Sequence, residues 1–192
     1  MRVITGKARG VQLKTPDGML TRPTADRVKE ACFSIIQFDL SGARVLDLFG
    51  GTGQLGIEAL SRGAKSAVFV DQREEACKLI RENLRRTRME SDAKVVRSDY
   101  LDYLRRTKDQ FDIIILDPPY AEVFLENALK CITEIDILCS GGIIVTERPA
   151  EKELPFEFDG FTRSKDYKYG KTLLTLYRKD EANEDRDLSR QL

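Results

Sequence analysis

Four consecutive residues, Asp117-Pro118-Pro119-Tyr120, have the side chains and spacing needed to hold a weakly nucleophilic amine for alkylation. They follow the apolar run at 113–116, which predicts a buried strand that ends just before Asp117. The Asp117 carboxylate and the Pro118 carbonyl can accept the two hydrogens of an exocyclic amine, so that its lone pair points at an electrophilic methyl group. Paired prolines fix the backbone, and Tyr120 can stack on a flipped-out base. The alternative interpretation is a proline-terminated strand with a surface tyrosine.

A second motif, LDLFGGTGQLG at 46–56, predicts an adenosine-binding loop. Gly51, Gly53 and Gly56 match the pattern of a tight strand-to-helix turn in which a ligand lies against bare backbone. Asp71 follows Gly51 by 20 residues, at the end of the next expected strand, where a carboxylate can hold ribose hydroxyls. The loop alone fits either NAD or S-adenosylmethionine. Asp47 favours the latter, because a carboxylate inside a strand needs a partner and a cationic methionyl group supplies one.

The composition excludes several other chemistries. The chain has no histidine, which removes Ser-His and Cys-His nucleophile pairs, histidine bases and histidine metal sites. Its four cysteines form no CxxC pair and lie in apolar-periodic segments, so we expect buried free thiols rather than a disulfide or a metal site. No secretory signal or membrane-spanning run is evident, and a cytoplasmic location is expected.

Charge is unevenly distributed under a net charge of zero. Counting from the sequence, residues 1–30 carry a balance of +4, residues 163–179 a balance of +5, and residues 180–192 a balance of −3. Basic segments of this kind fit a solvated surface and an RNA-binding surface equally well until another feature points to RNA.

The elements that must position these motifs alternate between strand and helix after residue 44. A short hairpin or edge strands are expected over 2–13. A helix is expected to begin after Pro23, with Thr24 as its N-cap, and to end before Ser41. Strands are expected at 45–49, 67–70, 94–96, 113–116 and 143–146, and helices at 55–61, 73–88, 100–106 and 123–135. Two further strands, 157–163 and 172–178, are expected to pair antiparallel at a sheet edge.

Short apolar strands that alternate with helices predict an α/β, Rossmann-like, doubly wound sheet covered by helices on both faces. At 192 residues the chain has room for one domain, which we place at 1–179. The acidic segment 180–192 is predicted to be a disordered tail.

Taken together, these motifs resemble the RsmD family, bacterial methyltransferases that act on the exocyclic N2 of one guanine in small-subunit (16S) ribosomal RNA. The resemblance covers most of residues 1–179 and is most specific in GKARG at 6–10 and TRPTADRVKEA at 21–31, with further matches at 46–64, 117–120 and 169–172. It implies a class I methyltransferase fold: a mostly parallel seven-stranded sheet with one C-terminal antiparallel strand. It also implies S-adenosyl-L-methionine as cofactor, and 16S rRNA or an assembling small subunit as partner of a monomeric enzyme without metal.

The resemblance assigns roles by position. Asp47 and the glycine loop would hold the methionine part of the cofactor, Asp71 its ribose and Asp99 its adenine edge. The predicted cofactor-binding residues are Asp47, Phe49, Gly50, Gly51, Gly53, Asp71, Gln72, Asp99 and Tyr100. The predicted catalytic residues are Asp117, Pro118, Pro119 and Tyr120. Residues 1–40 would form an RNA-contacting extension, with Lys7, Arg9, Arg22 and Arg27 as phosphate contacts.

Departures from the family pattern and rival functions leave alternatives open. Gly50 and Thr52 stand where the family usually has alanine and serine, and Lys171 where it has aspartate. Arg27 could equally pair with Asp26 or Glu30 on a helix surface. The rival functions are methylation of another amine, adenine N6 or a protein glutamine, an NAD-dependent oxidoreductase, and a non-catalytic RNA-binding scaffold.

Overall fold

The computed structural model of the protein describes residues 1–16, 23–119, 123–151, 154, 157–158 and 160–179. The helices are α1 Pro23–Ile35, α2 Gln54–Ser61, α3 Glu74–Thr87, α4 Tyr100–Arg106 and α5 Val123–Ile135, with a 3-10 turn at Glu90–Asp92. The strands are β1 Arg44–Asp47, β2 Ser66–Asp71, β3 Ala93–Arg97, β4 Phe111–Leu116, β5 Leu138–Pro149, β6 Glu157–Phe158, β7 Phe161–Tyr169 and β8 Thr172–Lys179. The expected acidic tail lies outside the described residues.

All strands belong to one sheet, in the order β3-β2-β1-β4-β5-β8-β7-β6. Strands β1 to β5 run parallel, while β8 inserts antiparallel beside β5 and pairs with β7. The mostly parallel sheet with a C-terminal antiparallel strand is therefore confirmed. The expected single strand 157–163 is wrong in detail, because the chain reverses at Gly160, whose φ of 74° is left-handed. Two strands, β6 and β7, form there instead, and the described sheet has eight strands rather than seven.

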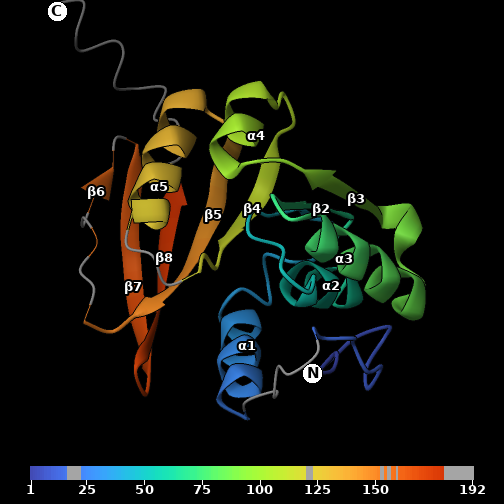
Figure 1. Ribbon diagram of the computed structural model, residues 1–192. Helices are drawn as coiled ribbons and strands as arrows, with labels where there is room; N and C mark the ends of the chain where they lie inside the picture. Colours follow the sequence, from blue (N-terminus) through green and yellow to red (C-terminus); the bar gives the residue numbers. More distant parts are fainter. Residues whose placement is uncertain (17–22, 120–122, 152–153, 155–156, 159, 180–192) are drawn as a thin grey trace, which may run out of the picture.

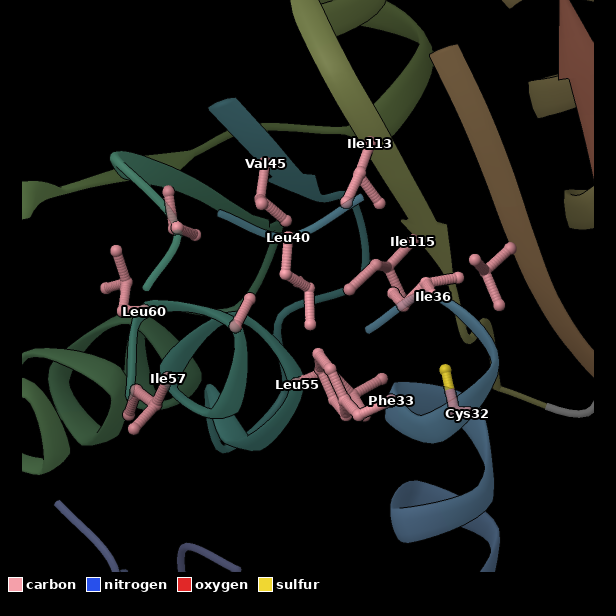
Figure 2. Packing of buried hydrophobic residues seen from close by; sticks show 14 of the residues in the cluster. Cys32, Phe33, Ile36, Leu40, Val45, Leu55, Ile57, Leu60, Ile113 and Ile115 are labelled. Carbon is pink, nitrogen blue, oxygen red and sulfur yellow. The ribbon is translucent and has the colours of Figure 1, made fainter. Parts of the chain in front are cut away.

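Helices cover both faces of the sheet, with α1, α2 and α3 on one side and α4 and α5 on the other (Figure 1). Successive residues along each strand enter opposite clusters, as a pleated strand requires. Ile113 and Ile115 of β4 pack on the α1 side, whereas Ile114 and Leu116 pack on the α5 side. Figure 2 shows Phe33 of α1 beside Leu55, and Ile36, the residue after the helix, beside Ile115. Helix α1 is thereby fixed over the carboxyl ends of the central strands.

The N-terminal segment is a turn docked on α2 rather than a hairpin of regular strands. A single antiparallel bridge joins Arg2 and Gln12, supported by a hydrogen bond from the Val3 amide to the Val11 carbonyl, 3.0 Å. Helix α1 begins at Pro23 itself, so Thr24 lies inside the first turn and is not the N-cap as expected. Proline is well suited to that first helical position because its missing N–H would be unpaired there anyway.

The expected free thiols are confirmed: Cys32, Cys77 and Cys131 are buried. Cys139 is half-buried and accepts a hydrogen bond from the Arg44 guanidinium, 2.9 Å. Within the described part of the chain, no helix has the length and apolar character needed to cross a membrane.

Candidate active site

The glycine loop connects β1 to α2 and is held against β2 by backbone hydrogen bonds. The Gly50 amide donates to the Val70 carbonyl, 2.8 Å. Gly53, the N-cap of α2, has a left-handed φ of 79°, which would be strained in a residue with a side chain. Gly56 serves a different purpose: a Cβ there would lie 2.2 Å from the Phe69 ring. The absence of a side chain at position 56 therefore lets α2 pack closely against β2, as the glycine motif predicts.

Two buried acceptor atoms at the two ends of this loop, on the last residue of β1 and the first residue of α2, lack hydrogen-bond donors. Asp47 is 1% exposed, and its Oδ2 accepts a hydrogen bond from the Gly56 amide, 3.0 Å. Its Oδ1 and the Gln54 Oε1 are the buried side-chain atoms without a partner in the described part of the chain. Burial, and then the nearby carboxylates, raise the pKa of Asp47 to about 7 despite the Gly56 hydrogen bond. These unpaired acceptors fit an ammonium group such as that of a methionine moiety.

Asp71 lies at the end of β2 as expected, but its carboxylate is fully engaged. Gly51 donates its amide to Oδ2, 3.0 Å, and the Arg73 amide donates to Oδ1, 2.9 Å. The Arg73 guanidinium adds bonds of 3.1 Å to each oxygen. Burial opposes ionisation, yet the Arg73 and Gly51 hydrogen bonds hold the pKa of Asp71 below its usual value. A ribose would have to displace the exposed Arg73 side chain, because a carboxylate accepts about four hydrogen bonds.

Three aromatic rings meet beside the loop on the α4 side. Phe49 and Tyr100 have centroids 5.2 Å apart, and Phe124 of α5 lies 6.2 Å from Phe49 and 5.5 Å from Tyr100. Phe49 and Tyr100 were predicted to bind cofactor, whereas Phe124 was not predicted. The grouping provides an apolar wall of the kind that an adenine ring packs against.

Asp99 and Gln72 occupy exposed positions at the carboxyl ends of β3 and β2. Asp99 is the N-cap of α4, and its Oδ1 accepts hydrogen bonds from the amides of Leu101, 2.9 Å, and Asp102, 3.3 Å. A capping role is thus established by the contacts, and a contact of either side chain with adenine remains a prediction.

Asp117 follows β4 directly, with Pro118 half-buried and Pro119 exposed beyond it. Strand β4 is the neighbour of β1, and the Leu48 amide donates to the Ile115 carbonyl, 3.2 Å. The expected reactive element and the glycine loop therefore leave the sheet from adjacent strands at the same edge. Tyr120 lies outside the described residues.

Glu147 is a site residue that the sequence analysis missed. Leu116 of β4 and Thr146 of β5 are register partners, so Asp117 and Glu147 follow them side by side. Packing around Asp117 raises its pKa to about 6, and burial, followed by the Asp117 charge, raises the pKa of Glu147 to about 8. The Asp117 charge thus disfavours ionisation of the neighbouring Glu147. In the sequence Glu147 follows the apolar run 143–146 just as Asp117 follows 113–116, although β5 continues past it to Pro149, and this signal was available.

Helix α1 closes over this pair of carboxyls. Burial, and then the charges of Glu147 and Asp117, raise the pKa of the Cys32 thiol to about 12. Cys32 belongs to the core cluster on the α1 side of the sheet, to which Asp47 also points by strand alternation. Asp47, Asp117 and Glu147 therefore share one face of three neighbouring strands under α1.

The predicted RNA-binding residues fall on two separate elements. Lys7 and Arg9 are exposed on the N-terminal turn, and Arg27 is exposed on α1. Neither Asp26 nor Glu30 forms an ion pair with Arg27 among the contacts of the described residues. Arg22 lies outside the described residues.

Buried charges that the sequence analysis did not identify fix the N-terminal turn. Glu58 of α2 is fully buried and accepts hydrogen bonds from the amides of Ile4, 2.8 Å, and Thr5, 3.0 Å. The buried Lys29 of α1 lies 3.8 Å from the same carboxylate and donates to the Arg2 carbonyl, 2.6 Å. One acidic side chain thus joins the N-terminal turn, α1 and α2.

Comparison with known proteins gives consistent matches over most of the chain. A family model described as conserved hypothetical protein 95 matches residues 1–178. The Bacillus subtilis protein named "Putative rRNA methyltransferase YlbH" is 40% identical over 182 residues, which cover 93% of this chain and 99% of the relative. The Escherichia coli ribosomal RNA small subunit methyltransferase D is 30% identical over 184 residues, covering 96% and 92%.

A solved structure supports the same architecture. The Escherichia coli protein titled "Putative methyltransferase yhhF" superposes with a TM-score of 0.85 at 30% identity, over 94% of this chain and 98% of that one. The class I methyltransferase fold expected from the sequence is confirmed.

Proposed function

The chain belongs to the family described as conserved hypothetical protein 95, the RsmD family of methyltransferases, and from this premise we propose that it methylates the exocyclic N2 of a guanine in small-subunit ribosomal RNA. The methyl donor is S-adenosyl-L-methionine, and the substrate is 16S rRNA, free or in an assembling subunit, in the cytoplasm. Residues 1–179 act as one domain, with residues 1–40 as the RNA-contacting extension.

The observation that carries this proposal is the adjacency of β1 and β4. Parallel neighbours end at the same edge, so the glycine loop after Asp47 and the rigid segment after Leu116 face a common space. The loop offers unpaired acceptors on Asp47 and Gln54 for a cationic amino acid moiety. A cofactor and a base bound to these two segments would lie beside each other.

In this mechanism the protein's main task is to orient the target amine. A guanine N2 lone pair is delocalised into the ring, and it becomes available when the Asp117 carboxylate and the Pro118 carbonyl accept its two hydrogens. The bound cofactor supplies an activated methyl group. Asp117 takes the proton that the nitrogen loses on methylation, and the raised pKa of this carboxyl makes it a better acceptor than an ordinary aspartate.

The test is to incubate the protein with radiolabelled S-adenosylmethionine and 16S rRNA from cells that lack this protein, and then digest the RNA to nucleosides. We expect label in N2-methylguanosine, and loss of turnover in Asp117→Ala with cofactor affinity kept. Label in N6-methyladenosine would replace guanine with adenine as the target. Binding of NAD instead of S-adenosylmethionine in calorimetry would contradict the proposal altogether.

A scaffold function predicts a different result for the same variant. A protein that only binds RNA would keep its effect on ribosome assembly when Asp117 is replaced by alanine. Complementation by the variant in cells that lack the protein therefore distinguishes enzyme from scaffold. For an enzyme we expect the variant to restore neither methylation nor the effect on ribosome assembly, whereas restored assembly would favour the scaffold.

A further inference from the structure

The β7–β8 hairpin reaches the same sheet edge as the candidate active site. Pro149, the last residue of β5, is the register partner of Thr172, the first residue of β8. The Ala150 amide also donates to the Lys171 carbonyl, 2.8 Å. In Figure 1 the hairpin extends beyond the neighbouring strands toward the end of the molecule where α1 lies. Its turn, residues 169–172, is thus placed beside the segment that follows β5.

A lateral row of residues connects Asp117 to this hairpin. Glu147 on β5 is the register partner of Leu174 on β8, which is the partner of Tyr167 on β7. Tyr167 and Tyr169 both pack half-buried against the core cluster on the α1 side, the face that Asp117 and Glu147 share. Two aromatic side chains therefore continue the surface of the site outward from the target position.

The charges of the hairpin are unbalanced once its internal pairs are counted. Asp166, the acidic residue of the segment, accepts hydrogen bonds from the guanidinium groups of Arg148, 3.0 Å, and Arg163. Lys165, Lys168 and Lys171 are exposed, and no ion pair involves them in the described part of the chain. Lys165 instead lies 5.1 Å from the Tyr167 ring centroid. By strand alternation Lys165 lies on the same sheet face as the two tyrosines and Lys168 on the opposite face, while Lys171 lies in the turn. The tip thus presents three positive charges around two aromatic rings.

Resting on the proposed function, we infer that the hairpin tip, residues 165–171, binds the RNA strand that flanks the target base. The lysines contact phosphates, and Tyr167 and Tyr169 contact bases. Aromatic rings interspersed with cations are the features with which proteins hold single strands without reading their sequence. The occupant must be a strand rather than an isolated base, because the row runs laterally across β5, β8 and β7 away from Asp117.

The lysine contribution is tested through the salt dependence of binding to a protein-free 16S rRNA transcript. Each phosphate contact on a single strand adds about 0.7 to the slope of log affinity against log salt. The triple variant K165Q/K168Q/K171Q should therefore lower the slope by about 2, which corresponds to about hundredfold weaker binding at 0.1 M salt if affinities converge at 1 M. The matched control K65Q/K108Q/K130Q removes three exposed lysines that lie outside the hairpin. We expect its slope to equal that of the wild type.

The aromatic contribution is tested separately by Tyr169→Leu, which keeps an apolar side chain against the core. Its salt slope should be unchanged, while affinity extrapolated to 1 M salt falls about tenfold. Equal slopes for the hairpin triple variant and the wild type would overturn the inference, and N2-methylguanosine formed by the wild type would leave the proposed function standing. Weaker binding to assembling subunits alone, with naked RNA unaffected, would also overturn it and would favour a ribosomal protein as occupant. Absence of any methylated nucleoside with the wild type would contradict the proposed function itself.

Discussion

Replacing Asp47 with asparagine should make the protein more stable at neutral pH while weakening cofactor binding. The amide oxygen can still accept the Gly56 hydrogen bond, so the substitution mainly removes a buried negative charge. A rise in pKa from 3.8 to about 7 corresponds to about 4 kcal/mol of unfavourable free energy for the ionised carboxylate. The folded state holds the proton more tightly than the unfolded chain, so stability falls as pH rises through this interval.

The change is measurable by urea denaturation at pH 5 and pH 7.5, followed by far-ultraviolet circular dichroism because the chain has no tryptophan. The free energy of unfolding changes by about 1.4 kcal/mol per pH unit between the unfolded and folded pKa values of Asp47. From pH 5 to pH 7.5 the wild type should therefore lose about 3 kcal/mol of unfolding free energy relative to Asp47→Asn. Asp112→Asn is the matched control with the opposite sign. The hydrogen bond from Arg44 lowers the pKa of Asp112 below 3.8, so this carboxyl is ionised in both the folded and the unfolded chain over this interval. Asp112→Asn should therefore be less stable than the wild type by the same amount at both pH values.

Calorimetry with S-adenosylmethionine completes this test. A cationic ligand beside Asp47 would draw its pKa down, and wild-type binding should release a proton below pH 7, seen as heats that differ between buffers of unequal ionisation enthalpy. Asp47→Asn should bind more weakly and lose this proton release. Parallel stability curves for the variant and the wild type at both pH values would refute the assignment of a buried, destabilising charge at this position.

Three further predictions concern the reactive carboxyl, the helix contact and the N-terminal turn. Because the pKa of Asp117 is raised to about 6, the rate of single-turnover methyl transfer should decline as pH falls through 6, where this carboxylate takes up a proton. Cofactor affinity measured over the same pH range shows whether weaker cofactor binding causes the decline instead. Gly56→Ala should destabilise the protein by about 1–3 kcal/mol in urea denaturation, because its Cβ would lie 2.2 Å from Phe69, although alanine normally favours a helix. Glu58→Gln should cost about 3 kcal/mol, because the buried Lys29 loses its counter-charge; unchanged amide exchange in the N-terminal turn would contradict this.

Local sequence signals predicted most of the fold. The bounds of α4 and α5 agree with the expected 100–106 and 123–135, since each helix follows clear breakers and has one apolar face. The glycine loop, Asp71 and Asp117 could also be placed, because their positions relative to strand ends are fixed within a few residues. The division of residues 157–163 into two strands was missed although the sequence signals it, because Asp159-Gly160 between Phe158 and Phe161 is a pair typical of tight hairpin turns.

The remaining features depend on contacts between distant segments. Glu58 is a polar residue in a predicted helix, and its burial follows from the docking of Ile4 and Thr5, more than 50 positions away. The hydrogen bonds from the Arg73 guanidinium to Asp71 depend on side-chain conformation, which hydrophobic periodicity does not predict. Glu147 is the exception, since its place after the apolar run 143–146 repeats the pattern of Asp117 and could have been recognised.

Asn83 of α3 gives the N-terminal turn and the glycine loop a shared anchor. Its fully buried amide donates to the carbonyls of Thr52, 2.9 Å, and Lys14, 3.0 Å, and its oxygen accepts the Lys14 amide, 2.7 Å. A ligand that immobilises the glycine loop therefore also orders the N-terminal turn, so that the turn loses less conformational entropy when it binds its own ligand, and the reverse holds as well. Thermodynamic reciprocity then requires the small molecule and the macromolecule to enhance each other's affinity by one common factor.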